Sequence, residues 1–312
     1  MSSYYIGDFI RDTRIRKGYT QEQLCRGVCT SASLSRIENG AQTPGVTTLN
    51  CLMQRLGIDD RIFDVFESKK EMQICGMLDE MVCNIMHREY DKLEENSRKL
   101  EELIGEGEAP EHQYLVFAKC ILNERHGASD EEVMEQLMQA IHMTLPEFDG
   151  VMPLETNLLT YNEITIINNI ASMHAKKERY EEALALGLWL KHYMEEHVID
   201  GSEKRSKYPM IVYNLSNWFG RMGKSEESLK EAEEGINFCV GHGCLHVLPV
   251  LVFNKGCALA ELNDIEGAKE AFCQSVVLFE MTGQEERVTR TAELCKEHYG
   301  IELYKTSCWS SK

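Results

Sequence analysis

Residues 14–58 read RIRKGYTQEQLCRGVCTSASLSRIENGAQTPGVTTLNCLMQRLGI, and the helix signals in this stretch decide the N-terminal fold. Thr20 followed by Gln23 has the spacing of a capping box, which predicts a short helix over Gln21–Gly27. After a tight turn, another short helix is predicted over Ser31–Asn39, stopped by the glycine that follows. Two short helices joined in this way are the pattern of a helix-turn-helix unit.

A helix is also predicted on each side of this unit. Gly18 ends the preceding helix, whose apolar residues recur on one face. After the Pro44-Gly45 loop, a further helix is predicted over Thr47–Leu56, ending at Gly57. We therefore expect the N-terminal segment to be a small bundle of four helices.

The charge of the chain is divided unevenly. The whole chain has a net charge of −18 and a pI near 5.0, which taken alone argues against nucleic-acid binding. Residues 1–58, however, contain seven basic and four acidic side chains, a net charge of +3, so the remainder carries −21. A mildly basic module joined to a larger acidic one points to nucleic-acid binding by the smaller part.

Length and composition narrow the class of protein. A chain of 312 residues suggests two domains, and six prolines among many Leu, Ala, Glu and Met favour an all-helical fold. No apolar run has the length of a membrane span and the first residues lack the features of a secretory signal, so we expect a cytoplasmic protein with no membrane partner. Its cysteines are then expected to stay reduced and most of them to pack inside, Cys25 and Cys29 included.

The N-terminal segment resembles the Xre/Cro (phage-repressor) family of helix-turn-helix domains. The matching residues are Arg14, Gly18, Thr20, Gln21, Leu24, the block Leu34–Gly40, Pro44, Leu56 and Gly57. The turn between the second and third helices is one residue shorter than in the typical phage repressor. The resemblance implies that the third helix lies in the major groove of DNA, and that Arg14 and Glu38 form a buried ion pair.

The resemblance also implies which residues contact DNA. They are Gln21, Ser31, Ala32, Ser33, Ser35, Arg36 and Asn39. Arg36 has the forked side chain that can bind a guanine edge through two hydrogen bonds, and Gln21 begins a helix at which family members hold a phosphate. The alternative for the serines is that they are helix caps or solvated surface. Because a charge of +3 binds DNA only weakly, we expect a homodimer on double-stranded DNA, at a palindromic operator.

Three later stretches repeat one pattern of helix, polar turn and second helix. They are residues 166–190, 211–236 and 251–276. Each has an asparagine two residues before a small residue, at Asn169, Asn214 and Asn254, which gives repeat steps of 45 and 40 residues. Two weaker units precede them, at 77–103 and 113–141, and a last helix over Gln284–His298 is predicted to cap the array.

These units resemble tetratricopeptide repeats, although their period exceeds the usual ~34 residues. The predicted fold class is therefore all-α, with an N-terminal repressor-type helix-turn-helix domain followed by a right-handed tetratricopeptide-like α-solenoid. The predicted domains are 1–66 (helix-turn-helix), 67–72 (linker helix), 73–303 (about five repeats plus the capping helix) and 304–312 (tail). Stacking buries the apolar faces of the units and leaves a concave groove lined by their first helices.

The two parts together resemble the RRNPP family, the Rgg/PlcR-like peptide-pheromone receptors of Gram-positive bacteria. The resemblance implies a quorum-sensing transcriptional regulator whose repeat groove binds a short signalling peptide and gates DNA binding by the dimer. An asparagine amide can donate to one backbone group of an extended peptide and accept from another. The residues assigned to the peptide are Asn168, Asn169, Lys176, Tyr213, Asn214, Asn217, Arg221, Phe253 and Asn254.

Two rival functions stay open. In the first, the repeats are a scaffold for a protein partner and the helix-turn-helix localises that partner to DNA. In the second, the chain modulates a response-regulator protein, as the Rap members of the family do without a DNA-binding domain. Asparagine at the repeat position is also common in tetratricopeptide sequences with other ligands, and Tyr213 and Phe253 are equally candidates for the core.

One cluster suggests a metal. Cys239, His242, Cys244 and His246 place four candidate ligands in eight residues, which is a compact zinc-like spacing. They fall where one repeat passes to the next, and the glycines among them are turn residues. No nucleotide-binding loop, serine-hydrolase elbow or zinc-protease motif is present. We therefore predict no metal, no cofactor and no enzymatic activity.

Overall fold

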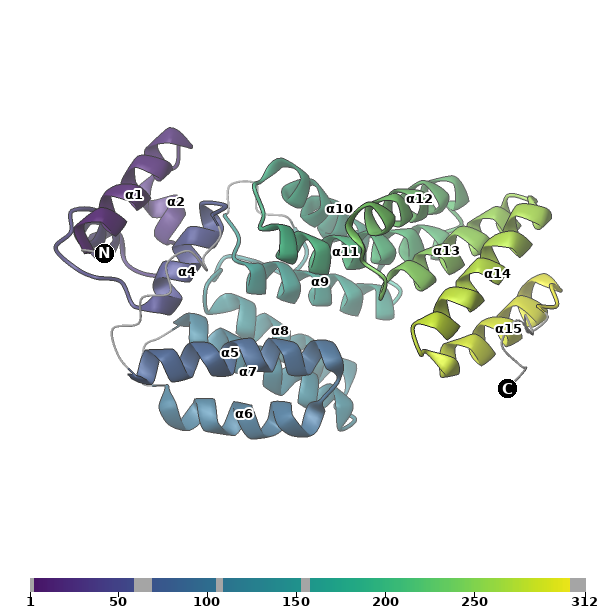
Figure 1. Cartoon of the computed structure of the whole chain (residues 1–312), viewed down its shortest axis with the longest axis horizontal. Coiled ribbons are helices and arrows are strands. Elements are labelled where there is room, and N and C mark those ends of the chain that lie inside the picture. Colours follow the sequence, from purple (N-terminus) through teal and green to yellow (C-terminus); the bar gives the residue numbers. More distant parts are fainter. Residues whose placement is uncertain (1–2, 59–68, 105–108, 153–157, 304–312) are drawn as a thin grey trace. The chain divides into compact units, whose positions relative to one another are not determined.

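The computed structural model describes residues 3–58, 69–104, 109–152 and 158–303. Within these ranges the chain is all-α, as predicted, with fifteen helices and no strand (Figure 1). The helices are α1 (Ser3–Arg16), α2 (Gln21–Cys25), α3 (Ser31–Glu38), α4 (Val46–Arg55), α5 (Lys69–His87), α6 (Tyr90–Leu103), α7 (Ala109–Arg125), α8 (Asp130–His142), α9 (Tyr161–Lys176), α10 (Tyr180–Glu196), α11 (Gly201–Arg221), α12 (Ser225–His242), α13 (Leu248–Glu261), α14 (Ile265–Met281) and α15 (Glu285–Tyr299).

The chain divides into two compact units. Unit 1 comprises Met1–Lys177 and Glu195–Asp200, and unit 2 comprises Glu178–Met194 and Gly201–Lys312. Helices α1 to α9 belong to unit 1, and α10 to α15 belong to unit 2 apart from the last two residues of α10. The predicted tail, 304–312, and the first two residues of the predicted linker lie outside the described residues. The predicted limits of the functional domains stay a prediction.

Helices α1 to α4 surround one apolar core. Ile10, Leu24 and Leu34 are fully buried in it, and Leu158, which precedes α9, packs into the same core. Helix α1 approaches α3 at Gly7, where a Cβ atom would overlap the backbone of α3. A glycine is therefore needed where the first helix crosses the third.

The predicted capping box is present at the start of α2. Thr20 Oγ1 accepts a hydrogen bond from Gln23 N at 3.1 Å, and Gln23 Oε1 accepts one from Thr20 N at 2.8 Å. The predicted end at Gly27 is wrong, because Arg26 leaves the helical conformation (φ −50°, ψ 122°) and Gly27 has a φ of +67°. The other two short helices end within one residue of their predicted limits.

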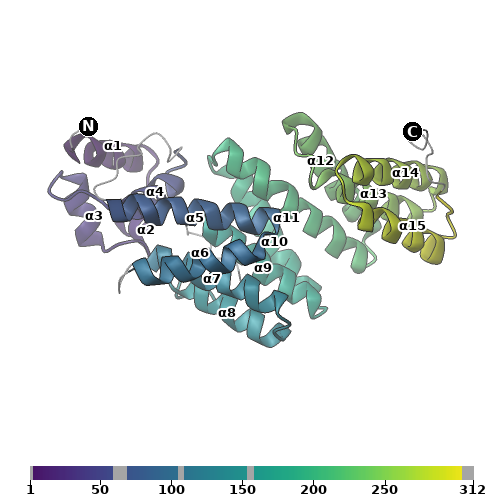
Figure 2. The ribbon, with the colours of Figure 1, turned by 60° about the horizontal axis from the view of Figure 1, so that its bottom comes forward.

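Helices α5 to α9 complete unit 1 by packing in chain order (Figure 2). Helix α5 contacts α6, α6 contacts α7, α7 contacts α8 and α8 contacts α9. Met81, Leu93 and Leu100 are fully buried between the first of these helices. The predicted linker residues 69–72 are helical, but they are the first turn of the long helix α5.

In unit 2, the helices from α11 to α15 also pack in chain order. Helix α11 contacts α12, α12 contacts α13, α13 contacts α14 and α14 contacts α15. Small residues permit close packing: a Cβ atom at Gly256 would lie 2.6 Å from the ring of Phe272. The hydroxyls of Ser216 and Ser228 each donate to the other residue's carbonyl oxygen, at 2.9 and 2.8 Å. These small residues lie in the interior of the unit, where large side chains would separate the helices.

Along the chain, the helices from α5 to α14 coincide with the predicted repeats. The five pairs from α5 to α14 contain the five predicted stretches, and α15 lies within one residue of the predicted capping helix at both ends. The chain is thus a helix-turn-helix bundle followed by a helical-repeat array. No helix in the described ranges is long and apolar enough to cross a membrane.

The segment with zinc-like spacing is a helix end. Cys239 is buried, His242 Nδ1 lies 2.9 Å from the carbonyl oxygen of Phe238, and Gly243 caps α12 with a φ of +71°. Among the described residues, no three His, Cys, Asp or Glu side chains come together in an arrangement that could hold a metal ion. Gly243 is the turn residue that the sequence predicts.

Candidate nucleic-acid interface

Helix α3 buries one face and exposes the other. Its buried side chains are Leu34, Ile37 and Glu38. Of the residues predicted to contact DNA, Ser31, Ala32, Arg36 and Asn39 are exposed, and Ser33 and Ser35 are half-buried. The helix therefore presents Arg36 on the side away from the core, which is the placement that reading a major groove requires.

The polar residues of α3 also serve the helix itself. Thr30 caps it, since Thr30 Oγ1 accepts from Ser33 N at 3.0 Å and lies 2.9 Å from Ser33 Oγ. Asn39 Nδ2 donates to the carbonyl oxygen of Ser35 at 2.8 Å at the other end. Ser33 thus takes part in the cap at the start of α3, in line with the alternative for the serines, and Asn39 bonds to the end of the helix, whereas Arg36 extends from an exposed position.

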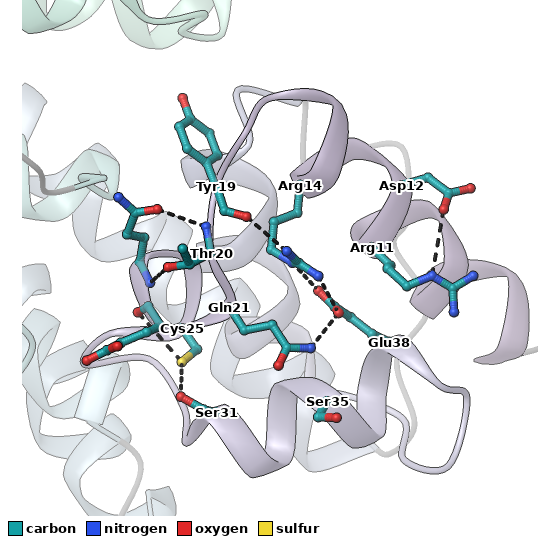
Figure 3. Close-up of polar contacts among 12 residues, drawn as sticks. Arg11, Asp12, Arg14, Tyr19, Thr20, Gln21, Cys25, Ser31, Ser35 and Glu38 are labelled. Carbon is teal, nitrogen blue, oxygen red and sulfur yellow. Dashed lines mark hydrogen bonds and ion pairs between the residues drawn. The ribbon is translucent and has the colours of Figure 1, made fainter.

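A charged brace fixes α3 against α1 and α2 (Figure 3). Arg14 Nε donates to Glu38 Oε1 at 2.6 Å and Arg14 Nη2 donates to Glu38 Oε2 at 2.9 Å, a two-pronged ion pair. Gln21 Nε2 donates to the same Glu38 Oε2 at 2.7 Å, and Arg14 Nη1 donates to the carbonyl oxygen of Tyr19 at 2.9 Å. Glu38 is buried, and its hydrogen bonds raise the pKa of Arg14.

The brace confirms the ion pair that the family resemblance implies. It also gives Gln21 an intramolecular partner, because its amide is directed to Glu38 (Figure 3). A phosphate contact by Gln21 therefore stays a prediction that involves its remaining amide oxygen, its second amide hydrogen or the N-terminus of α2. The structural consequence is rigidity: α3 is held by charge as well as by its apolar face.

A second ion pair connects the bundle to the helical array within unit 1. Arg55, in the last turn of α4, donates from Nη2 to Glu163 Oε1 at 3.1 Å, and both side chains are fully buried. Arg55 Nη1 also donates to the carbonyl oxygens of Leu24 and Arg26, at 3.1 and 2.5 Å. Glu163 accepts from Thr160 N at 2.6 Å in the capping box that begins α9. One guanidinium therefore joins α2, α4 and α9.

The turn between α2 and α3 contributes a further contact with the array. Arg26 Nη2 lies 2.5 Å from Glu147 Oε1, and a Cβ atom at Gly27 would overlap the backbone of Thr144. Arg55, Glu163 and this turn contact are absent from the residues predicted from the sequence. The available signal was the single arginine among the apolar residues of a predicted helix, since a charge at such a position needs a buried partner.

The asparagines of α9 lie in unit 1. Asn168 and Asn169 are half-buried, and Asn169 Nδ2 donates to the carbonyl oxygen of Thr165 at 2.8 Å, one turn earlier in the helix. Lys176 is exposed but forms ion pairs with Asp130 at 2.7 Å and Glu124 at 3.7 Å. Carboxylates of the protein thus already surround the cation that was assigned to a peptide carboxylate.

The remaining predicted peptide contacts lie in unit 2. Tyr213, Asn214 and Asn217 are half-buried on α11, as are Phe253 and Asn254 on α13, whereas Arg221 at the end of α11 is exposed. The structure brings two of them together, since Asn254 Nδ2 donates to the carbonyl oxygen of Tyr213 at 3.4 Å. The ring of Phe253 packs against that of Phe272 at a centroid distance of 5.5 Å, and Tyr213 packs against a neighbouring core. Both aromatic residues therefore contribute to the core.

Comparison with known proteins agrees with this architecture. Residues 6–62 match the family model of a helix-turn-helix domain. No curated protein matches the chain in sequence. The N-terminal bundle is therefore a helix-turn-helix domain, with α3 as the second helix of the motif.

Three solved structures are similar over nearly the whole chain. Bacillus thuringiensis PlcR in complex with the peptide PapR7 and DNA has 18% identity and a TM-score of 0.59, covering 92% of this chain and 99% of its own. The apo form of the same protein has 17% identity and a TM-score of 0.57, covering 93% and 98%. Apo ComR from Streptococcus vestibularis has 13% identity and a TM-score of 0.52, covering 96% and 100%. The chain shares the fold of these proteins.

Proposed function

We propose that the chain is a cytoplasmic DNA-binding transcriptional regulator in which a short signalling peptide, bound by the repeats, gates DNA binding by a homodimer. The observation that carries the DNA-binding part is the exposed face of α3, with Arg36 directed outward and Glu38 anchored to Arg14 and Gln21. A braced helix with an exposed forked cation matches the chemistry of reading guanine. Similarity to PlcR, whose solved complex contains DNA, supports the same assignment.

Dimerisation follows from the charge of the bundle. A net charge of +3 on residues 1–58 neutralises few phosphates, and the acidic remainder repels the DNA backbone. Two copies on two half-sites double the favourable contacts, and their spacing makes affinity depend on the geometry of the dimer. We therefore assign a palindromic operator with one α3 in each half-site.

The peptide assignment is supported by the half-buried asparagines on the first helices of the repeats. Asn169, Asn214 and Asn254 are half-buried, so part of each amide is accessible, and an amide can both donate to and accept from a peptide backbone. Similarity to PlcR, solved with the peptide PapR7, supports a peptide of comparable size. Lys176 is a weaker member of the set because it already binds two carboxylates.

A route between the two functions is supported by α9. This helix contains Asn169, and its first turn contains Glu163, which holds Arg55 of the helix-turn-helix bundle. A ligand that shifts α9 along its axis changes the geometry around Glu163, and a buried ion pair tolerates little displacement. The bundle would then respond to occupancy of the repeats.

Two selections test this proposal. In the first, the full chain is used to enrich binding sites from random duplex DNA, and enrichment of a two-fold symmetric sequence is expected. In the second, the immobilised chain is used to enrich ligands from a library of short linear peptides, with the Asn169→Ala/Asn214→Ala variant as the matched control. If no duplex is enriched, the proposal that the chain is a DNA-binding regulator is contradicted. Failure to enrich peptides, with capture of a stoichiometric protein partner, would favour the scaffold.

A further inference from the structure

The turn between α2 and α3 brings two cysteines together. Cys25 is the last residue of α2, and its carbonyl oxygen accepts hydrogen bonds from Val28 N at 2.9 Å and from Cys29 N at 3.0 Å. Gly27 makes this reversal possible, because its φ of +67° is a conformation that glycine adopts without strain. The backbone therefore returns on itself within five residues, which brings Cys29 close to Cys25.

The surroundings of the pair favour one thiolate. The neighbouring Cys29 side chain, together with Ser31 and the positive charge of Arg55, lowers the pKa of Cys25 to about 6. Ser31 Oγ lies 3.4 Å from Cys25 Sγ. The Cys25 side chain, together with burial, raises the pKa of Cys29. Of the two thiols, Cys25 is therefore the one that loses its proton more readily.

Other buried cysteines of the chain behave differently. Burial raises the pKa of Cys120, Cys239 and Cys295 to about 12 in each case, which keeps them as unreactive thiols. These residues are the small apolar side chains that the sequence predicts. Cys25 and Cys29 are also packed inside or partly inside, but their mutual contact gives them a different chemistry.

We propose that Cys25 and Cys29 form a modification site for hydroperoxides, which convert the pair into an intramolecular disulfide. The site combines a nucleophilic sulfur, a second thiol in contact with it and a backbone turn that holds both. A disulfide spans Cα atoms about 4.4–6.8 Å apart, and a turn closed by the hydrogen bond from Cys29 N to Cys25 O keeps the two residues within this reach.

The reaction balances in two steps. The Cys25 thiolate attacks one oxygen of the hydroperoxide, so that an S–O bond forms, the O–O bond breaks and the leaving oxygen takes a proton to become water or an alcohol. The Cys29 sulfur then attacks the sulfenic acid at Cys25, so that an S–S bond forms and the S–O oxygen leaves as water with the proton from Cys29. The two thiols lose two electrons in total, and the hydroperoxide gains them.

Access limits the reagent to a small molecule. Only 3% of Cys25 is exposed, whereas Cys29 is partly exposed beside it. Because Cys25 is almost fully covered, a small oxidant such as a hydroperoxide reaches its sulfur more readily than a bulky thiol reagent does.

Tryptic mapping provides a direct test on the full chain. Trypsin cuts after Arg26, so Cys25 falls in the peptide GYTQEQLCR (18–26) and Cys29 falls in GVCTSASLSR (27–36). Reduced protein is treated with graded hydrogen peroxide at pH 7, blocked with N-ethylmaleimide and digested. The expected product is the two peptides joined by a bond that dithiothreitol cleaves, in protein that remains monomeric on a denaturing gel without reductant. It should form at least about tenfold faster than oxidation of the exposed Cys83, because the thiolate is the reactive form.

Three variants complete the test, each checked for unchanged helicity by circular dichroism. Cys29→Ser should accumulate a sulfenic acid at Cys25 that dimedone traps, Cys25→Ser should give no adduct at Cys29, and Cys51→Ser should still form the bond. The proposal is overturned if the two peptides stay separate while Cys83 is oxidised, or if Cys29→Ser yields no dimedone adduct at Cys25. Joining of Cys29 to Cys51 instead would overturn it as well.

Discussion

Arg55 and Glu163 lie 108 residues apart in sequence and form an ion pair in which neither side chain is exposed. Arg55 makes two further hydrogen bonds, to backbone carbonyls of the α2 region, whereas its Nε is buried without a hydrogen-bond partner. Glu163 uses its other oxygen for the cap of α9. The pair therefore ties the end of α4 to the start of α9, at the cost of removing two charges from water.

Breaking this pair should destabilise the protein strongly. Arg55→Met keeps most of the volume of the side chain but leaves the Glu163 carboxylate buried without its cation, so we expect a loss of about 3–5 kcal/mol of stability. The double variant Arg55→Met/Glu163→Gln should lose less, because no buried charge is left over. Hydrogen exchange of the α4 and α9 amides measures the change in the free energy of local opening.

The exposed pair Arg98–Glu102 of α6 supplies the control. Both side chains are about two-thirds exposed and the ion pair is 2.9 Å long, so Arg98→Ala should cost no more than about 1 kcal/mol. If Arg55→Met were as mild as Arg98→Ala, the buried pair would not be the tie between α4 and α9 described above.

The close approach of Gly27 to Thr144 predicts that alanine substitution destabilises the protein to different degrees at two glycines. Gly27 and Gly18 both have positive φ, but a Cβ atom at Gly27 would overlap the backbone of Thr144, whereas one at Gly18 has nothing within 4 Å. Gly18→Ala should therefore lower the free energy of unfolding by only about 1 kcal/mol, from backbone strain at positive φ. Gly27→Ala should lower it by about 1–3 kcal/mol more, because the added methyl group overlaps Thr144. Urea unfolding followed by circular dichroism compares them, and equal losses would argue against close packing at Thr144.

Arg36 should determine base recognition. Arg36→Ala is expected to weaken binding to a selected operator by about 1–3 kcal/mol and to relax the preference at one base position in each half-site. Arg98→Ala removes the same charge from a helix outside the bundle and should leave affinity within twofold. Fluorescence anisotropy of labelled duplexes measures both, and an Arg36→Ala protein with unchanged affinity and specificity would remove Arg36 from the interface.

The asparagines of the first repeat helices should hold the peptide backbone. Asn169→Ala and Asn214→Ala are each expected to weaken binding of a selected peptide by about 0.5–1.5 kcal/mol, the net value of a neutral hydrogen bond. Asn96 on α6, whose Nδ2 donates to Glu80, provides an asparagine outside the predicted site as a control. Isothermal titration calorimetry gives the affinities. Equal affinities for the alanine variants of Asn169, Asn214 and Asn96 would place the peptide elsewhere.

Local signals predicted the fold well because they act within a few residues. The capping box at Thr20 and Gln23, the glycine stops and the repeated asparagines located nearly every helix. The end of α2 was missed because a positive-φ glycine can lie beyond a helix end as well as at it: here the chain leaves the helix at Arg26, one residue before Gly27.

The site was predictable only in part, for a related reason. Both the Arg14–Glu38 pair and the DNA-facing residues of α3 rest on the family resemblance. The third member of that brace, Gln21, was assigned to DNA because nothing local indicates its contact with Glu38. The Arg55–Glu163 pair and the thiol contact between Cys25 and Cys29 depend on tertiary packing and on a turn geometry that residue types alone do not specify.

The measurement that tests the central claim most directly is the affinity of the full chain for its selected operator with and without a saturating selected peptide. Coupling between two sites in proteins typically amounts to about 1–3 kcal/mol, so we predict that the peptide changes the Kd for the duplex by about 5- to 150-fold. The variant Asn169→Ala/Asn214→Ala should need a higher peptide concentration to give the same change. An identical Kd for the duplex, with the peptide shown to be bound in the same sample, would contradict a ligand-gated regulator.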